Sequence, residues 1–254
     1  MSKLNQSSSQ HHITHLRQDY SAIGDPTWSA KDFLEKNLEV SRNLFTPESL
    51  IARCPRPKEL EVFALLSGLP FPLNFSARLV AIQKQISAIL DERLHYWVSP
   101  SNLGVEYCVF KWPLESWNEE WLSIIRDKLE TIHQPSFRFS IKGVQINPDG
   151  CVVARGFDED GVLFRIREQL KAGIPFLPPK QSGWAHVPLG RILEPLGVER
   201  FAKLAQLINK LSDLPIVSTT INSMKLIHET RWYMEEKATL AEYFLANTSK
   251  GNRT

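Results

Sequence analysis

The residues that could do chemistry in this chain raise one question first, the role of a single histidine. His186 lies in Gly183-Trp-Ala-His-Val-Pro-Leu-Gly-Arg-Ile192, a run that predicts a short strand with a proline two residues after the histidine. An imidazole can take up or release a proton near neutral pH, but general acid/base catalysis needs a second group opposite it. Whether His186 is half of a catalytic pair therefore depends on what the rest of the chain supplies.

Glu106 is the carboxylate that could face this histidine. It lies in Val105-Glu-Tyr-Cys-Val-Phe-Lys-Trp112, which has the composition of a strand. A carboxylate and an imidazole across a cleft form an acid/base couple when their surroundings set their pKa values apart. The sequence contains no glycine-rich phosphate loop and no G-x-S-x-G turn.

Possible metal ligands are few. One cluster of histidines lies near the N-terminus, in a polar segment without a neighbouring thiol or carboxylate: His11, His12 and His15. The cysteines are isolated and odd in number, which favours reduced thiols over a disulfide framework: Cys54, Cys108 and Cys151. We therefore expect neither a metal nor a cofactor.

The composition is that of an ordinary globular protein. The 254 residues are 43% hydrophobic and 23% charged, and the net charge of +2 is too small to indicate nucleic-acid binding by itself. No apolar run approaches the roughly 18 residues of a membrane helix, and the N-terminus has no apolar signal segment. We therefore expect a cytoplasmic monomer that does not enter a membrane.

Four segments are expected along the chain. Residues 1–26 are rich in Ser, Gln, His and Asn with few periodic apolar positions, which predicts a flexible tail. Residues 27–57 predict a short helical extension, with one helix starting after Ser29. Residues 58–246 predict the folded domain, and residues 247–254 a second flexible tail.

Within the domain, strand patterns and helix patterns alternate, which predicts a mixed α and β fold. Strands are expected around His186 and at 60–66, 105–112, 137–146, 151–157, 216–221 and 224–231. Helices are expected at 76–90, 118–132, 161–171 and 198–211. Asn147-Pro-Asp-Gly150 predicts a hairpin turn between two of the strands.

Two stretches carry a resemblance to a known family. Tyr96-Trp-Val-Ser-Pro-Ser-Asn-Leu-Gly-Val-Glu-Tyr-Cys-Val-Phe110 resembles a family pattern W-V-P-P-E-N-L-H-L-T-L-x-F, and Ala185-His-Val-Pro-Leu-Gly-Arg-Ile192 resembles a second pattern H-x-T-L-x-R. Both patterns belong to the two-histidine (2H) phosphoesterases, the superfamily of RNA 2′,3′-cyclic phosphodiesterases and 2′-5′ RNA ligase-like proteins. The order and spacing of the two stretches support the resemblance over about residues 58–246.

The resemblance implies an α/β (α+β) architecture, the bilobal 2H phosphoesterase-like fold with two similar lobes around a central cleft. In the family, each lobe supplies one H-x-T motif, whose side chains at i and i+2 emerge from the same face of a strand. One histidine acts as general base on the attacking water, the other protonates the leaving oxygen, and the threonines bind the phosphate. The resemblance thus implies a nucleotide or RNA ligand in the cleft.

Three of the four motif positions carry residues that cannot perform this chemistry. The first histidine falls on Gly104 and the first threonine on Glu106, whose carboxylate would repel an anionic phosphodiester by about 4 kcal/mol at about 4 Å and an effective dielectric of about 20. The second histidine is His186, but its threonine falls on Pro188, which has neither a hydroxyl nor a backbone N–H. We therefore expect a degenerate active site.

Three interpretations remain open at this level. In the first, which we favour, the fold is retained as a non-catalytic binding or scaffold module for a nucleotide, an RNA or a protein partner. In the second, Glu106 and His186 serve as the acid and base of a hydrolase acting on a 2′,3′-cyclic phosphate or a related substrate. In the third, weakened phosphodiesterase activity persists with His95 or His228 recruited to the cleft.

Three other features have structural interpretations. Five tryptophans are expected to pack in the core rather than form a base-stacking platform: Trp97, Trp112, Trp117, Trp121 and Trp184. Three basic residues of one predicted helix are expected on a solvated face: Arg165, Arg167 and Lys171. The proline-rich loop 173–183 leads into the second motif and is expected to form a cleft rim or a partner-docking surface.

Overall fold

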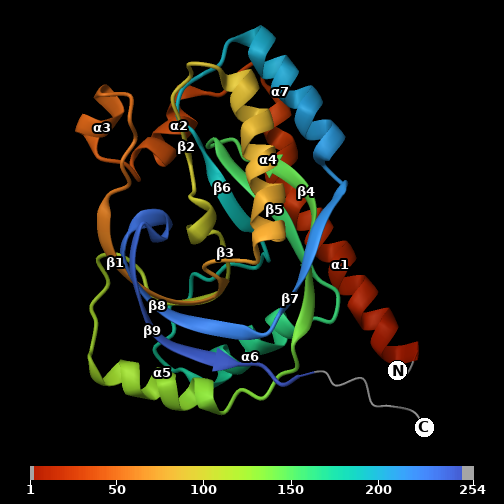
Figure 1. Ribbon diagram of the computed structural model, residues 1–254, viewed down its shortest axis with the longest axis vertical. Coiled ribbons are helices and arrows are strands. Elements are labelled where there is room, and N and C mark those ends of the chain that lie inside the picture. The colour runs from red at the N-terminus through yellow and green to blue at the C-terminus, as the bar shows by residue number, and fades with distance from the viewer. Residues whose placement is uncertain (1–2, 248–254) are drawn as a thin grey trace.

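Two β-sheets form the framework of the molecule (Figure 1). The structure is a computed structural model that describes residues 3–247, with side chains from residue 13 onward. Within these residues, one sheet has five strands in the order β2-β6-β5-β4-β7, and the other has four in the order β3-β1-β8-β9. The predicted α/β (α+β) fold with two lobes is confirmed, with one sheet in each lobe.

The strands of both sheets pair antiparallel. They are β1 (Glu59–Gly68), β2 (His95–Trp97), β3 (Gly104–Lys111), β4 (Phe137–Ile146), β5 (Cys151–Asp158), β6 (Val187–Ile192), β7 (Pro215–Ile221), β8 (Ser223–Arg231) and β9 (Glu236–Phe244). The helices are α1 (Lys3–Gly24), α2 (Glu35–Arg42), α3 (Pro47–Ile51), α4 (Leu73–Leu90), α5 (Glu120–Glu130), α6 (Val162–Gly173) and α7 (Val198–Leu211), with short 3-10 turns η1 (Asp25–Ser29), η2 (Pro100–Asn102) and η3 (Trp232–Met234).

Helices cover the outer face of each sheet (Figure 1). α4 and α7 lie against the five-stranded sheet, and α5 and α6 lie beneath the four-stranded sheet. In α4, the buried residues Leu79, Ile82 and Ile86 recur three and four positions apart, which gives one apolar stripe for the sheet. We call the opposite face of each sheet its inner face.

The predicted hairpin between β4 and β5 is present. Its turn ends at Gly150, whose φ of +82° favours glycine, and a Cβ atom there would lie 2.2 Å from the carbonyl oxygen of Ile192. The glycine therefore lets the hairpin turn approach the end of β6.

The expectation of a flexible tail over residues 1–26 is wrong for the described part, because residues 3–24 form α1. Leu16 and Tyr20 are buried, four positions apart on one side of this helix. The Tyr20 hydroxyl donates to the carbonyl oxygen of Gly156 at 3.1 Å and accepts from the Gly156 N–H at 3.2 Å. Because polar residues surround these two anchors, the composition of the segment hides a helix that is fixed to β5 by packing. The second expected tail lies outside the described residues except for Asn247.

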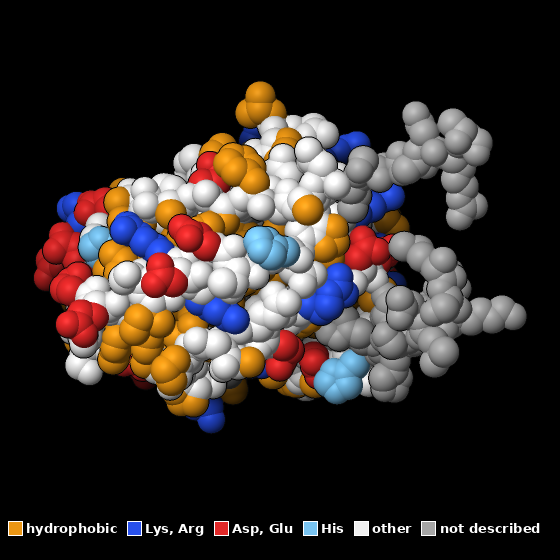
Figure 2. Space-filling model, turned by 90° about the horizontal axis from the view of Figure 1, so that it is seen from below, with side chains coloured by type: hydrophobic (Ala, Val, Ile, Leu, Met, Phe, Trp, Pro, Cys, Tyr) orange, Lys and Arg blue, Asp and Glu red, His pale blue; other side chains and the backbone are white. Residues whose placement is uncertain are grey.

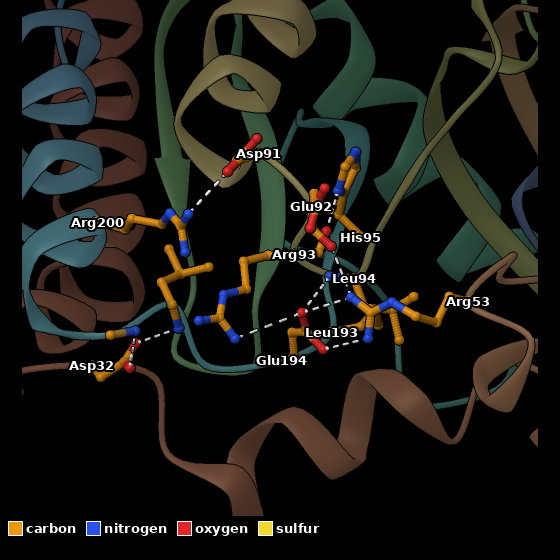
Figure 3. Close-up of polar contacts among 12 residues, drawn as sticks. Asp32, Arg53, Asp91, Glu92, Arg93, Leu94, His95, Leu193, Glu194 and Arg200 are labelled. Carbon is orange, nitrogen blue, oxygen red and sulfur yellow. Dashed lines mark hydrogen bonds and ion pairs between the residues drawn. The ribbon is translucent and has the colours of Figure 1, made fainter.

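The helical extension of residues 27–57 is present, but its first helix begins at Glu35 rather than after Ser29. Polar contacts fix it to the loop after β6 (Figure 3). Glu194 accepts hydrogen bonds from the Arg53 guanidinium at 3.0 and 3.1 Å and from the backbone N–H of Leu94 at 2.8 Å. Asp32 accepts from two backbone N–H groups at the start of α7. The extension is therefore part of the five-stranded lobe.

The loop 173–183 covers the free edge of β3. The Gln181 side-chain amide accepts from the backbone N–H of Val109 at 2.9 Å and donates to the carbonyl oxygen of Val109 at 2.8 Å. It thereby supplies the two hydrogen bonds that a neighbouring strand would make. This contact fixes the loop to the four-stranded sheet.

The helices of the described chain are too short or too polar to cross a lipid bilayer.

Candidate functional site

The first motif lies at the start of β3, as expected. Gly104 is the first residue of the strand and is buried, and Glu106 is half-buried opposite Leu66 of β1. Because the two positions are two residues apart, they share the inner face of the four-stranded sheet. The position of the missing histidine and the new carboxylate therefore lie side by side.

Leu69 occupies the space beside Gly104. A Cβ atom added to Gly104 would lie 3.3 Å from the Leu69 side chain and 3.2 Å from the carbonyl oxygen of Ser67, closer than most real contacts. Leu69 belongs to an apolar cluster on this inner face, formed by Val62, Ala64, Leu66, Leu69, Val109, Ile227 and Met234. Leu69 thus lies directly beside residue 104, the position at which the resemblance implies a histidine.

The second motif lies at the start of β6. His186 directly precedes the strand, and its ring lies edge-on to Trp184, with ring centroids 5.5 Å apart. Trp184 in turn contacts the Tyr20 ring of α1, at 5.1 Å between centroids. The His186 Nδ1 atom is buried and has no hydrogen-bond partner. The histidine is therefore half-buried beside Trp184, and no carboxylate accepts a hydrogen bond from its Nδ1 atom.

Pro188 lies where a proline costs a sheet least. It pairs with Val153 of β5 at a register shift, which is the irregular position expected for it. On the other side of β6, the β2 residues His95–Trp97 pair only with residues 190–192. The absent N–H of Pro188 is thus placed beyond the end of β2.

Arg167 of α6 joins the two motif strands, and the expectation that it lies on a solvated face is wrong. It is 4% exposed, and its guanidinium donates to the carbonyl oxygens of Glu106 at 2.7 Å, Tyr107 at 2.8 Å and Trp184 at 2.6 Å. Its Nη1 atom is buried without a partner. The sequence holds a signal for this burial, because Arg167 is four residues after Leu163 and three before Leu170, on the apolar stripe of the helix.

The two candidate acid/base residues have opposite pKa shifts. Burial raises the pKa of Glu106 to about 7, against the opposing effect of the Arg167 charge. Burial also lowers the pKa of His186 to about 4, with further lowering by the charges of Arg167 and Arg191. Between these values Glu106 holds its proton and His186 is neutral. In the described chain, no hydrogen bond or ion pair joins the two side chains.

The arginine of the second motif is engaged within the protein. Arg191 donates to Asp149 at 2.5 Å, to the Ser41 hydroxyl at 2.8 Å and to the Tyr233 hydroxyl at 2.7 Å. Burial opposes its charge, but the partners Cys151, Tyr233 and Asp149 together raise the pKa of its guanidinium. This guanidinium stabilises the junction of α2, the hairpin turn and η3.

The other two histidines considered for the cleft lie elsewhere. His95 begins β2, where its Nδ1 lies 2.6 Å from the carbonyl oxygen of Arg93. His228 stacks on Phe63, with centroids 4.5 Å apart, and Phe63 stacks on Trp117 near α5. The His228 ring is therefore on the outer face of the four-stranded sheet, away from Glu106.

A cluster of polar side chains that the sequence does not predict lies at the edge of the inner face of the four-stranded sheet. The Lys225 ammonium donates to the carbonyl oxygen of Leu69 at 3.1 Å, and the Lys237 ammonium donates to Asn102 Oδ1 at 2.7 Å and to the carbonyl oxygen of Met234 at 2.9 Å. Burial raises the pKa of Glu229, on the same face, to about 7, and the charge of Glu106 contributes to the shift. Asn102 lies two residues before Gly104, so this group borders the first motif.

The remaining sequence expectations have mixed outcomes. The five tryptophans are each half-buried, and most of them pack against the core, as expected. His15 pairs with Asp19 at 3.1 Å, while the side chains of His11 and His12 lie outside the described residues.

Two shallow surface cavities, of about 430 and 360 Å³, lie at the start of α7 and between α2 and α3, away from both motifs.

Comparison with known proteins identifies the fold. TT0787 of Thermus thermophilus is 15% identical, and the match covers 74% of this chain and 100% of TT0787 with a TM-score of 0.55. LigT of E. coli in apo form is 12% identical, over 74% of this chain and 99% of LigT, with a TM-score of 0.52. LigT complexed with 3′-AMP matches with 12% identity over the same shares and a TM-score of 0.50.

No protein-family model matches this sequence, and no curated protein matches it. The structural likeness at these identities shows the fold, and it confirms the 2H phosphoesterase-like architecture expected from the two motif stretches. About a quarter of the chain lies outside the match, although TT0787 is covered completely.

Proposed function

We propose that this chain, which has the 2H phosphoesterase-like fold of LigT and TT0787, is a non-catalytic binding module. The observation that carries the proposal is the inner face beside Gly104, where the Leu69 side chain lies 3.3 Å from the position that a Cβ atom would take at residue 104. A general acid/base pair needs two titratable groups at the reacting bond. Gly104 supplies no titratable group, and the adjacent Leu69 supplies none either.

The second motif supports the same proposal. His186 is neutral across the physiological range, because burial lowers its pKa to about 4. Pro188 offers no hydroxyl to a phosphate, and Arg191 is held by Asp149, Ser41 and Tyr233. The groups with which the family motif handles a phosphodiester are thus absent or engaged.

A nucleotide is the ligand that this proposal favours. LigT has been crystallised with 3′-AMP and with NADP+, and both complexes share the fold of this chain. An extended RNA needs a continuous basic surface. On the face seen in Figure 2, basic and acidic side chains are interspersed instead. We therefore expect a small nucleotide, and no long RNA strand on this face.

The test is turnover of 2′,3′-cyclic AMP. We expect no product above the buffer control for the wild-type protein, and equally none for His186→Ala. Turnover that disappears in His186→Ala would contradict the proposal.

A gain-of-function variant tests whether the substituted motif positions and the Leu69 side chain are the reason for the absence of catalysis. Gly104→His, Glu106→Thr and Pro188→Thr restore the motif, and Leu69→Ala makes room for the imidazole. Because burial still holds the pKa of His186 at about 4, we expect only weak turnover when all four changes are combined, and none in the matched variant that keeps Leu69.

A second candidate function is supported by the opposite pKa shifts. In a window from about pH 4 to pH 7, Glu106 could donate a proton and His186 could accept one, which are the roles needed for hydrolysis of a phosphodiester. This candidate predicts a bell-shaped rate profile with limbs near these two values, lost in both Glu106→Gln and His186→Gln. A flat profile at the buffer rate in all three proteins excludes it.

A further inference from the structure

Two lysines of the four-stranded sheet reach the same point from neighbouring strands. Lys225 lies on β8 and Lys237 on β9, and their ammonium groups contact Leu69 and Asn102 respectively. These two contacts are adjacent in space, because the backbone N–H of Leu69 donates to the carbonyl oxygen of Leu103 at 3.2 Å. Both ammonium groups therefore contact residues that adjoin Gly104, at the start of β3.

The charges of the two lysines are not balanced by direct ion pairs. Their acceptors are two backbone carbonyl oxygens and one side-chain amide oxygen, all neutral. In the described part of the chain, neither ammonium group forms an ion pair with a carboxylate. Burial lowers the pKa of Lys237, and the positive charge of Lys225 lowers it further, while Glu229 opposes both effects. Two cations that disfavour each other in this way are stabilised by an anion between them.

The surroundings supply a donor and access to solvent. Both lysines and Asn102 are half-buried, so each of these residues keeps contact with solvent. The Ser101 hydroxyl, which donates to Asn102 Oδ1 at 3.2 Å, is exposed. A side-chain amide, a hydroxyl and two ammonium groups are the donors that bind phosphoryl oxygens in proteins.

We propose that Lys225, Lys237 and Asn102 form an anion-binding site beside Gly104 that takes the phosphoryl group of a nucleotide. The inference deepens the proposed function and rests on it, since it names the group through which a non-catalytic module holds its ligand. The site replaces the histidine and threonine of the first motif by two ammonium groups from β8 and β9. Binding by fixed cations needs no proton transfer, so it survives the loss of the catalytic pair.

Nearby carboxyl groups give the site a pH dependence. Burial raises the pKa values of Glu106 and Glu229 to about 7, and both lie on the inner face with the lysines. Above this value each carries a negative charge that opposes a bound anion, while Arg167 favours one. We therefore expect Glu106→Gln/Glu229→Gln to bind 3′-AMP at least about threefold more tightly than wild type at pH 8, with a smaller difference at pH 6, because the variant lacks the repulsion and the ionisation of the ligand is the same for both proteins.

The experiment is calorimetric titration of the full-length protein with three probes: 3′-AMP, inorganic phosphate and adenosine. We expect both phosphates to bind and adenosine to bind at least tenfold more weakly than 3′-AMP. Equal affinities for 3′-AMP and phosphate assign recognition to the phosphoryl group alone, and tighter binding of 3′-AMP adds contacts to the nucleoside. Failure of both phosphates to bind the wild-type protein overturns the site.

Variants test the residues. Lys225→Met and Lys237→Met remove a charge and keep the apolar stem, and we expect each to weaken 3′-AMP binding at least tenfold. Lys210→Met, at an exposed position of α7, is the matched control and should bind like wild type. Lys237→Arg keeps the charge and should retain binding, which separates charge from folding. Unchanged affinity in the Lys225→Met/Lys237→Met double variant overturns the proposal.

The binding titrations and the turnover assay with 2′,3′-cyclic AMP together distinguish failure of this inference from failure of the proposed function. Turnover of 2′,3′-cyclic AMP together with lysine-dependent binding would sink the non-catalytic proposal and keep the anion site. No turnover and lysine-independent binding of 3′-AMP would keep the binding module and sink the site.

Discussion

The two motif regions have lost their chemistry in different ways. At the first, the histidine is absent, and an apolar cluster around Leu69 fills the inner face beside Gly104. At the second, His186 remains, but burial lowers its pKa to about 4 and its Nδ1 has no partner. One site is lost by substitution and packing, and the other by desolvation of a residue that is still present. A surviving catalytic residue is therefore weak evidence for surviving catalysis.

Arg167 donates hydrogen bonds to both motif regions. We therefore expect its removal to lower the stability of the protein more than any other change considered below. Arg167→Ala leaves three buried carbonyl oxygens without their donor, and we expect it to lower the free energy of unfolding by about 3 to 5 kcal/mol. Urea denaturation measures this change. Arg165→Ala, at an exposed position of the same helix, should cost less than about 1 kcal/mol. Equal effects of the two variants would show that Arg167 does not link the motifs.

The packing beside Gly104 is tested by Leu69→Ala. Removing this side chain leaves a cavity in the apolar cluster, and we expect a loss of about 2 to 3 kcal/mol in the free energy of unfolding. Leu73→Ala is the control, since Leu73 is 89% exposed and should change stability by less than about 0.5 kcal/mol. If Leu69→Ala is neutral, the first region is not closed by packing.

The opposite pKa shifts predict opposite pH dependences of stability. The folded state holds the Glu106 proton more tightly than the unfolded state, so the contribution of Glu106 to the free energy of unfolding decreases as pH rises from about 4.5 to 7. Glu106→Gln lacks this loss and should be more stable than wild type at pH 8 by about 1 to 3 kcal/mol, and similar to it at pH 4.

For His186 the sign is reversed. The unfolded state holds the His186 proton more tightly, so the contribution of His186 to the free energy of unfolding increases as pH rises from about 4 to 6.5. His186→Gln lacks that gain, so relative to wild type it should be more stable at pH 4 than at pH 7. Denaturation midpoints of wild type and of each variant across pH 4 to 8 measure how the stability difference depends on pH. If this difference changes with pH in the same direction for both variants, the two regions do not differ as described.

The smallest expected effect concerns the N-terminal helix beside the second region. Tyr20→Phe keeps the ring against Trp184 but leaves the N–H and carbonyl of Gly156 without their partner, at a cost of about 1 to 2 kcal/mol. Thermal denaturation compares it with Tyr243→Phe on β9, for which we expect no measurable change. A neutral Tyr20→Phe would mean that the hydroxyl does not fix α1 to the sheet.

The sequence predicts the fold well where periodicity and turn chemistry agree. The β4–β5 hairpin follows from Asn147 to Gly150, and α4 and α7 follow from their apolar stripes. The strand β9 and the helix α1 do not follow from the sequence pattern, because exposed edge strands and polar helices carry few periodic apolar residues. Tertiary packing, which no local pattern records, decides both elements.

The candidate site was predicted only in part. Gly104, Glu106, His186 and Pro188 follow from the resemblance, and the structure places them at the starts of β3 and β6. Leu69 and the two lysines could not be found in this way, because they come from other strands and reach the site through tertiary contacts. Burial, which sets the pKa values of Glu106 and His186, is likewise a property of the assembled fold.

The covered edge of β3 has a consequence for how the protein behaves in a crowded solution. An open edge strand is a template on which another chain can add a strand, and this is a route to aggregation. The Gln181 amide takes the N–H and the carbonyl of Val109, and Arg167 takes the carbonyls of Glu106 and Tyr107. These two side chains block strand addition at the β3 edge, so the loop that brings Gln181 to this edge removes one of the two edges at which another chain could pair with this sheet.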